Sequence, residues 1–103
     1  MQVFTINPLT KKIDAVEIAD TKEALQKLIG FSTIDSDEID DNGDRLFFDE
    51  ECFIRQQSNV GRFKVDSLAP VAGIGVIVNS KDGKIFQSPT ISAQELFKRV
   101  TYL

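Results

Sequence analysis

Residues 38–50, EIDDNGDRLFFDE, hold the strongest short-range folding signal of this 103-residue chain. Asn42-Gly43 at their centre is typical of a type I′ hairpin turn, because that turn needs positive φ at both central residues. The flanking residues, 33–39 and 46–54, have the composition of strands. The stretch therefore predicts a hairpin and, around it, an antiparallel sheet.

A further hairpin is predicted over residues 2–18. Polar and apolar residues alternate imperfectly in QVFTI (2–6) and again in KIDAVEI (12–18), on either side of the turn NPLT (7–10). The imperfect alternation indicates strands that are touched on both faces.

Two helices are predicted from capping signals. Asp20, with Glu23 three residues later, has the pattern of a capping box, and Gly30 ends the apolar periodicity that follows. Ser92 and Glu95 repeat the pattern near the C-terminus. The apolar residues that share one stripe of this second helix are Ala93, Leu96, Phe97, Val100 and Leu103.

The segment between residues 55 and 90 is predicted to contain a crossing and two strands. Residues 55–70 are polar with Gly and Pro, which favours an irregular connection. VAGIGVIVNS (71–80) is typical of a buried strand, and KIFQS (84–88) is expected to return after a turn. The glycines at 73 and 75 stand at the start of a strand, which favours close packing over a nucleotide-binding loop.

These elements predict one domain over residues 1–103, of the α+β class. An antiparallel sheet of hairpins is expected to carry both helices on one face, in the order ββαββββα. The residues expected in its core are Val3, Ile6, Val16, Ile18, Leu25, Leu28, Ile29, Phe47, Ile74, Val76, Val78, Leu96, Phe97 and Val100.

The composition argues against catalysis. The chain has no His, the commonest general base, and its one cysteine, Cys52, forms no internal disulfide or cysteine zinc site. We expect a non-catalytic protein without a cofactor or metal. No apolar run approaches the ~20 residues of a membrane span, and the first residues lack a signal-peptide pattern. We therefore expect a cytoplasmic protein without membrane contact.

Charge is distributed unevenly along the chain. Residues 35–51 hold nine acidic residues and one basic residue, a local charge of −8, whereas the other 86 residues hold 11 basic and 7 acidic residues, or +4. Such polarity steers charged partners, and a run this dense resembles the phosphates of a nucleic acid. The residues predicted to contact a partner protein through this acidic hairpin are Asp37, Glu38, Asp40, Asp41, Asp44, Asp49 and Glu50.

The same stretch partly fits the frame of a calcium-binding EF-hand loop. With Glu38 at position 1, Asn42 and Gly43 fall at positions 5 and 6. However, Glu stands in place of Asp at position 1, Arg45 occupies the apolar position 8, and Asp49 replaces the bidentate Glu at position 12. The flanks also indicate strands where an EF-hand has helices, so no calcium site is expected.

Two other functions stay open from the sequence. Arg55, Arg62 and Lys64 form a basic group, and they could bind a nucleotide or another anion, or merely neutralise the acidic hairpin. Pairing of exposed edge strands would instead make a structural homo-oligomer. Direct nucleic-acid binding is not expected, because the chain has a net charge of −4.

The N-terminal stretch INPLTKKIDAVEIADTKEALQKLIG resembles the opening of a family of small uncharacterised domains from bacteria, phages and other mobile elements. The resemblance lies in a hairpin that ends in VEI, a helix that closes with Ile29-Gly30, and a later segment like PVAGIGVIVNSKDG. It covers about half the chain; residues 35–67 differ from the family's Asn-rich middle segment. The resemblance implies a phage or mobile-element origin and no particular activity.

Together these observations predict a small accessory protein that binds, and through binding can inhibit, a host protein. The acidic hairpin is the predicted contact surface. The alternatives are a nucleotide- or anion-binding protein and a structural homo-oligomer.

Overall fold

In the computed structural model, residues 1–55 and 59–103 are described. The described residues form β1 (Gln2–Asn7), β2 (Lys12–Glu17), α1 (Lys22–Ile29), β3 (Ile34–Glu38), β4 (Asp44–Asp49), β5 (Arg62–Val65), β6 (Val71–Ala72), β7 (Gly75–Asn79), α2 (Ala93–Arg99) and β8 (Val100–Tyr102). All strand pairs are antiparallel, so the predicted α+β class is confirmed. The predicted crossing, 55–70, includes residues 56–58, which lie outside the described residues.

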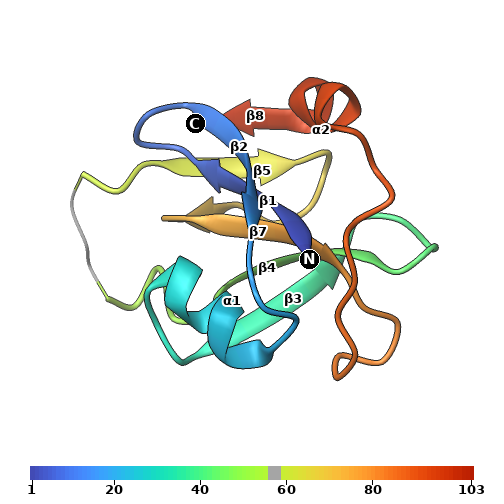
Figure 1. Cartoon of the computed structure of the whole chain (residues 1–103). Coiled ribbons are helices and arrows are strands. Elements are labelled where there is room, and N and C mark those ends of the chain that lie inside the picture. The colour runs from blue at the N-terminus through green and yellow to red at the C-terminus, as the bar shows by residue number, and fades with distance from the viewer. Residues whose placement is uncertain (56–58) are drawn as a thin grey trace.

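The strands form two sheets (Figure 1). The larger has the order β2-β1-β7-β4-β3, and the smaller has the order β6-β5-β8. Strand β7 is central in the larger sheet, and all five of its residues are buried, which is typical of a strand covered on both faces. The predicted single strand 71–80 is divided, because Val71–Ala72 form β6 of the smaller sheet and residues 73–74 separate it from β7. Strands β2 and β3 are the two edges of this sheet, on opposite sides of the domain.

Each face of the larger sheet has its own core. On one face, Leu25 and Ile29 of α1 pack against Val3, Val76 and other apolar residues. On the opposite face, Phe63 and Val65 of the smaller sheet and Leu96 of α2 pack against side chains that include Ile6 and Ile77. The prediction that both helices cover one face is therefore wrong, because the smaller sheet and α2 share the face that α1 leaves open (Figure 1).

Gly75 lets the two sheets approach each other. A Cβ atom at this position would lie 2.5 Å from Cζ of Phe63 and 2.8 Å from Cδ1 of Leu46, closer than real Cβ contacts. Both of these side chains are buried in the core between the sheets. The packing role expected for this glycine is consistent with that geometry.

Helix boundaries follow the capping residues with one correction. Thr21, not Asp20, is the N-cap of α1, and its hydroxyl accepts the Ala24 N–H at 3.2 Å. Gly30 ends this helix at φ 92°, as predicted. Ser92 caps α2 as predicted, accepting the Glu95 N–H at 3.1 Å.

The end of the chain leaves the helix earlier than predicted. Val100 to Tyr102 pair with β5, residue by residue from Val65↔Val100 to Phe63↔Tyr102. Pairing with β5 therefore overrides the helical periodicity of these residues. β5 itself lies in the stretch 55–70, for which the sequence predicts an irregular connection. Leu103, beyond this strand, is exposed, and so is Phe97 within α2, whereas both were predicted on the buried stripe.

Two other strand predictions need correction. Residues 50–54 turn away after Asp49, so Phe53 and Ile54 are exposed rather than part of a strand. Residues 84–88 form only a bridge, between Gln87 and Asn79. Of the predicted core, the residues only half-buried are Val16, Ile18, Leu28, Ile74 and Val100.

Substitutions in α2 test which of its faces is buried. Leu96→Ala is expected to lower the free energy of unfolding by about 2–4 kcal/mol, because Leu96 is fully buried. Phe97→Ala is expected to change it by less than about 0.5 kcal/mol, because Phe97 is 69% exposed. Urea unfolding of both variants measures the difference; equal losses would contradict this placement of α2.

Candidate partner-binding surface

The acidic hairpin is built on β3 and β4. The strands pair from Ile34↔Asp49 to Glu38↔Arg45, and the loop closes where Ile39 N–H donates to the Asp44 carbonyl at 3.0 Å. Within Asn42-Gly43, only Gly43 has a positive φ, 99°. The hairpin is confirmed, but its predicted two-residue type I′ turn is replaced by a wider loop.

Asn42 explains the wider loop. Its side-chain oxygen accepts the Asp44 N–H at 3.0 Å, and its side-chain nitrogen donates to Thr90 Oγ1 at 2.6 Å. Its carbonyl accepts from the Asn79 amide at 3.0 Å. Asn42 therefore ties the loop to β7 and to the segment before α2, contacts that a type I′ turn signal alone does not indicate.

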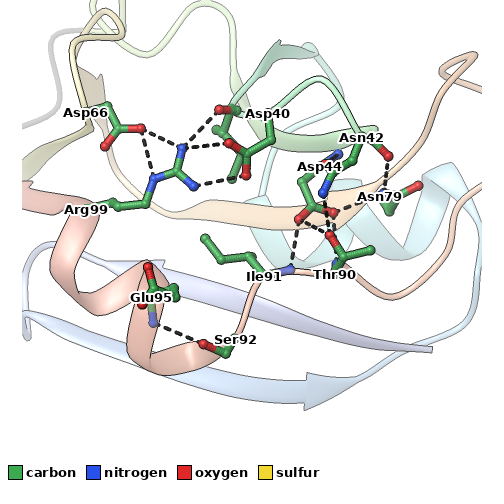
Figure 2. Close-up of polar contacts among 11 residues, drawn as sticks. Asp40, Asn42, Asp44, Asp66, Asn79, Thr90, Ile91, Ser92, Glu95 and Arg99 are labelled. Atoms are coloured by element: carbon green, nitrogen blue, oxygen red, sulfur yellow. Dashed lines mark hydrogen bonds and ion pairs between the residues drawn. The ribbon is translucent and has the colours of Figure 1, made fainter.

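Asp44 is the buried centre of this arrangement (Figure 2). The residue is 0% exposed, and its carboxylate lies among Asn79, Thr90 and Ile91. One carboxylate oxygen accepts from Thr90 N–H at 2.9 Å and from the Asn79 amide at 3.0 Å; the other accepts from Thr90 Oγ1 at 2.8 Å and Ile91 N–H at 2.9 Å. Burial raises the pKa of Asp44, but these hydrogen bonds outweigh burial and hold it below its ordinary value.

Arg99 brings a second part of the hairpin into contact with the rest of the domain (Figure 2). The guanidinium donates to both oxygens of Asp40 at 3.0 and 3.1 Å and to the Ile39 carbonyl at 3.0 Å. It also donates to Asp66, the nearer bond being 2.6 Å. The hydrogen bonds to Asp66 and Asp40 raise the pKa of Arg99 above its already high ordinary value.

A third contact, at the other end of the hairpin, joins Asp49 to Arg55. Arg55 Nε donates to Asp49 at 2.6 Å, and Thr33 Oγ1 also donates to Asp49 at 2.6 Å. Burial raises the pKa of Asp49, but the hydrogen bond from Arg55 leads the contacts that lower it overall. Arg55 lies 3.9 Å over the ring of Phe31 and pairs with Glu51 at 3.5 Å.

The predicted site residues therefore separate into two groups. Asp44 and Asp49 are buried and serve the fold, and Asp40 is held by Arg99, so these carboxylates are not presented to a partner. Glu38 is exposed and pairs with Arg45 at 3.1 Å, a weak contact at a surface. Besides buried Asp44, whose partners are all neutral, the acidic residues that make no ion pair within the described part of the hairpin are Asp35, Asp37, Asp41 and Glu50.

These four residues and Glu38 define the acidic edge. Asp35 and Asp37 lie on one face of β3, which is an edge strand of the larger sheet. Asp41 lies in the loop after β3, and Glu50 directly follows β4. The charge excess predicted for the hairpin is thus concentrated along one edge of the domain.

The predicted basic group is not preserved as one cluster. Arg62 and Lys64 lie on the outer face of β5, opposite to buried Phe63 and Val65. Arg55 is occupied by Asp49, Glu51 and Thr33, so its donors are directed into the fold. An anion site on β5 would have to use Arg62 and Lys64 without it.

Comparison with known proteins gave no match among family models, curated proteins or solved structures. The family resemblance of the N-terminal stretch therefore stays a prediction. Among the described residues, no three His, Cys, Asp or Glu side chains are grouped as metal ligands, and neither helix has the length and apolar character to cross a membrane.

The Asp44 network predicts a defined loss of stability. Asp44→Asn is expected to lower the free energy of unfolding by about 2–4 kcal/mol. The NH2 group of the introduced Asn would face hydrogen-bond donors and, unlike the carboxylate oxygen that it replaces, could not accept hydrogen bonds from them. Asp41→Asn, at an exposed position of the same loop, is the matched control and should unfold like the parent chain. Urea unfolding of both variants at neutral pH measures the effect; a neutral Asp44→Asn would contradict it.

The lowered pKa of Asp44 also predicts a pH dependence. Stability from this carboxylate is complete above its ordinary value of 3.8 and is lost as pH falls through the lower folded-state pKa. Unfolding free energy measured from pH ~6 to ~2 should therefore fall less steeply in Asp44→Asn than in the parent chain. Part of the pH dependence that remains in Asp44→Asn is expected to come from Asp49, whose pKa is also lowered. Identical slopes would contradict this assignment.

Calcium is expected to leave the melting temperature unchanged. A site formed only in the folded state would stabilise it by mass action, but the oxygens of Asp44 and Asp49 already accept hydrogen bonds within the fold. Thermal unfolding with and without millimolar calcium, read beside magnesium as a control, tests this. A saturable rise specific to calcium that Asp41→Asn abolishes would show a site in the loop.

Proposed function

We propose that this chain is a small non-catalytic accessory protein of a phage or mobile element that binds, and thereby can inhibit, a host protein. The observation that carries the proposal is the acidic edge. Asp35, Asp37 and Glu38 lie on the edge strand β3, Asp41 follows that strand in the loop, and Glu50 directly follows β4. The family resemblance supports the origin, and the scarcity of catalytic groups in the sequence supports a binding role.

The partner surface should be basic. Clustered exposed carboxylates attract a basic patch at long range and accelerate association, and the attraction is screened by salt. Edge charges also protect a strand from pairing with other chains, which is the other physical role for Asp35 and Asp37. The two roles can be told apart by experiment, because protection against strand pairing requires no specific partner protein.

The anion-binding alternative has weaker support. It was predicted on Arg55, Arg62 and Lys64, and Arg55 already has carboxylate partners inside the domain. A nucleotide released from purified protein on denaturation would favour this alternative. A stable multimer without a bound nucleotide or protein partner would favour the structural homo-oligomer.

The acidic edge is tested by affinity capture from a bacterial lysate. The parent chain should retain a defined protein that elutes with rising salt, and the triple variant Asp35→Asn, Asp37→Asn, Asp41→Asn should lose it. For the purified pair, the association rate should fall about tenfold or more in the triple variant, because charge steering acts mainly on this rate.

A matched control separates the acidic edge from total charge. Glu17→Gln, Asp20→Asn and Glu23→Gln together remove the same charge from exposed positions near α1. This variant should bind the partner like the parent chain. Equal loss in both triple variants, or retention in both, would contradict a specific role for the acidic edge.

A further inference from the structure

A groove of about 930 Å³ lies between the start of β2 and α2, away from the acidic edge. The helix and β2 are in contact, and the groove opens beside the point where they meet. Ile13, Ala93 and Phe97 provide its apolar surface. Its volume is in the range of ligand-binding clefts, and its open form suits an extended chain better than an enclosed small molecule.

Phe97 is the unexplained residue of this groove. It is 69% exposed, whereas the preceding Leu96 is fully buried and anchors α2. A phenyl ring held in the open beside half-buried Ile13 provides an apolar contact that the fold itself does not use. Aromatic residues are enriched in the cores of protein interfaces.

Basic residues surround this apolar surface. Lys11, Lys12 and Lys98 line the groove, and Asp14 is the one acidic residue among those that line it. Glu95 lies 3.6 Å from Lys98 and offsets part of this charge, although the pair is exposed and therefore a weak contact. Three lysines still outnumber the two carboxylates of Asp14 and Glu95. The groove therefore has a positive excess on a chain whose net charge is −4.

The backbone of β2 adds a third element. β2 is an edge strand, and its described residues pair only with β1. Its outward N–H and C=O groups are therefore available to an added strand at the side of the groove. An extended peptide could use these groups while its side chains reach the lysines and Phe97.

We propose that this groove binds an extended, acidic segment of a partner protein that carries at least one aromatic or large aliphatic side chain. The carboxylates would meet Lys11, Lys12 and Lys98, and the apolar side chain would pack on Phe97. Nucleic acid fits less well, because Asp14 and the net negative charge of the chain oppose a phosphate backbone. This surface is separate from the acidic edge and does not depend on the function proposed for it.

The probe is a synthetic eight-residue peptide, EDVFDLDE, titrated into the isotope-labelled full chain and followed by amide NMR shifts. Shifts should concentrate at β2 and α2 and saturate below about 1 mM peptide at low salt. Lys12→Glu with Lys98→Glu should weaken binding about tenfold or more, and so should Phe97→Ser. Lys22→Glu with Lys84→Glu, an equal charge change at exposed positions elsewhere, should leave binding unchanged.

Two further probes of the same groove are expected to bind weakly or not at all. A peptide in which Lys replaces every acidic residue should not bind, and single-stranded DNA should bind less tightly than EDVFDLDE. Absence of saturation, equal binding of the lysine peptide, or tighter binding of DNA would each overturn the proposal. Concentration-dependent self-association lost in Phe97→Ser, without peptide binding, would also overturn it in favour of a second copy. Unchanged amide dispersion in each variant confirms that the fold is intact.

Discussion

The buried carboxylate of Asp44 is the constraint on which the rest of this domain depends. It accepts four hydrogen bonds from the side chain of Asn79, the backbone of Thr90 and Ile91, and the Thr90 hydroxyl. These contacts join the acidic hairpin, the central strand β7 and the segment that leads into α2. A buried charge is costly unless it is fully hydrogen-bonded, so the hairpin loop must adopt the form that brings these donors together.

This constraint changes how the local charge of the chain should be interpreted. The sequence places a charge of −8 in residues 35–51, but Arg99 and Arg55 approach the hairpin from outside that segment. Asp40, Asp44 and Asp49 are then occupied by the fold. The charge presented to a partner is smaller than the sequence total, and it lies along β3, at Asp41 in the loop that follows, and at Glu50 just after β4.

Local signals predicted local structure well. The first hairpin, the end of α1 at Gly30 and the cap of α2 at Ser92 follow from short patterns whose partners lie nearby in the sequence. The failures concern long-range pairing. Helical periodicity continues through Val100, but β5 pairs with that residue from 35 positions earlier, and sheet pairing decides its conformation.

The candidate site shows the same division. The Asn42-Gly43 pair predicted that the site lies on a hairpin. The burial of Asp44, however, depends on hydrogen-bond donors 46 and 47 residues away, at Thr90 and Ile91. A single sequence offers no signal for that contact. Asp-rich runs therefore indicate where charge lies in the chain, and only the fold separates structural carboxylates from those that reach the surface.

The two edges of the larger sheet bear on whether this chain assembles with itself. Pairing of β2 with β3 of another copy would bring Asp14 and Glu17 of β2 beside Asp35, Asp37 and Glu38 of β3, with Lys12 as the basic residue within either strand. Like charges on adjacent strands oppose pairing, whichever register is chosen. The positive excess near β2 comes instead from Lys11 and Lys98, which lie outside the strand and beside the groove. Side-chain charge therefore disfavours pairing of β2 with β3 between copies while leaving each edge open to a partner of the opposite sign.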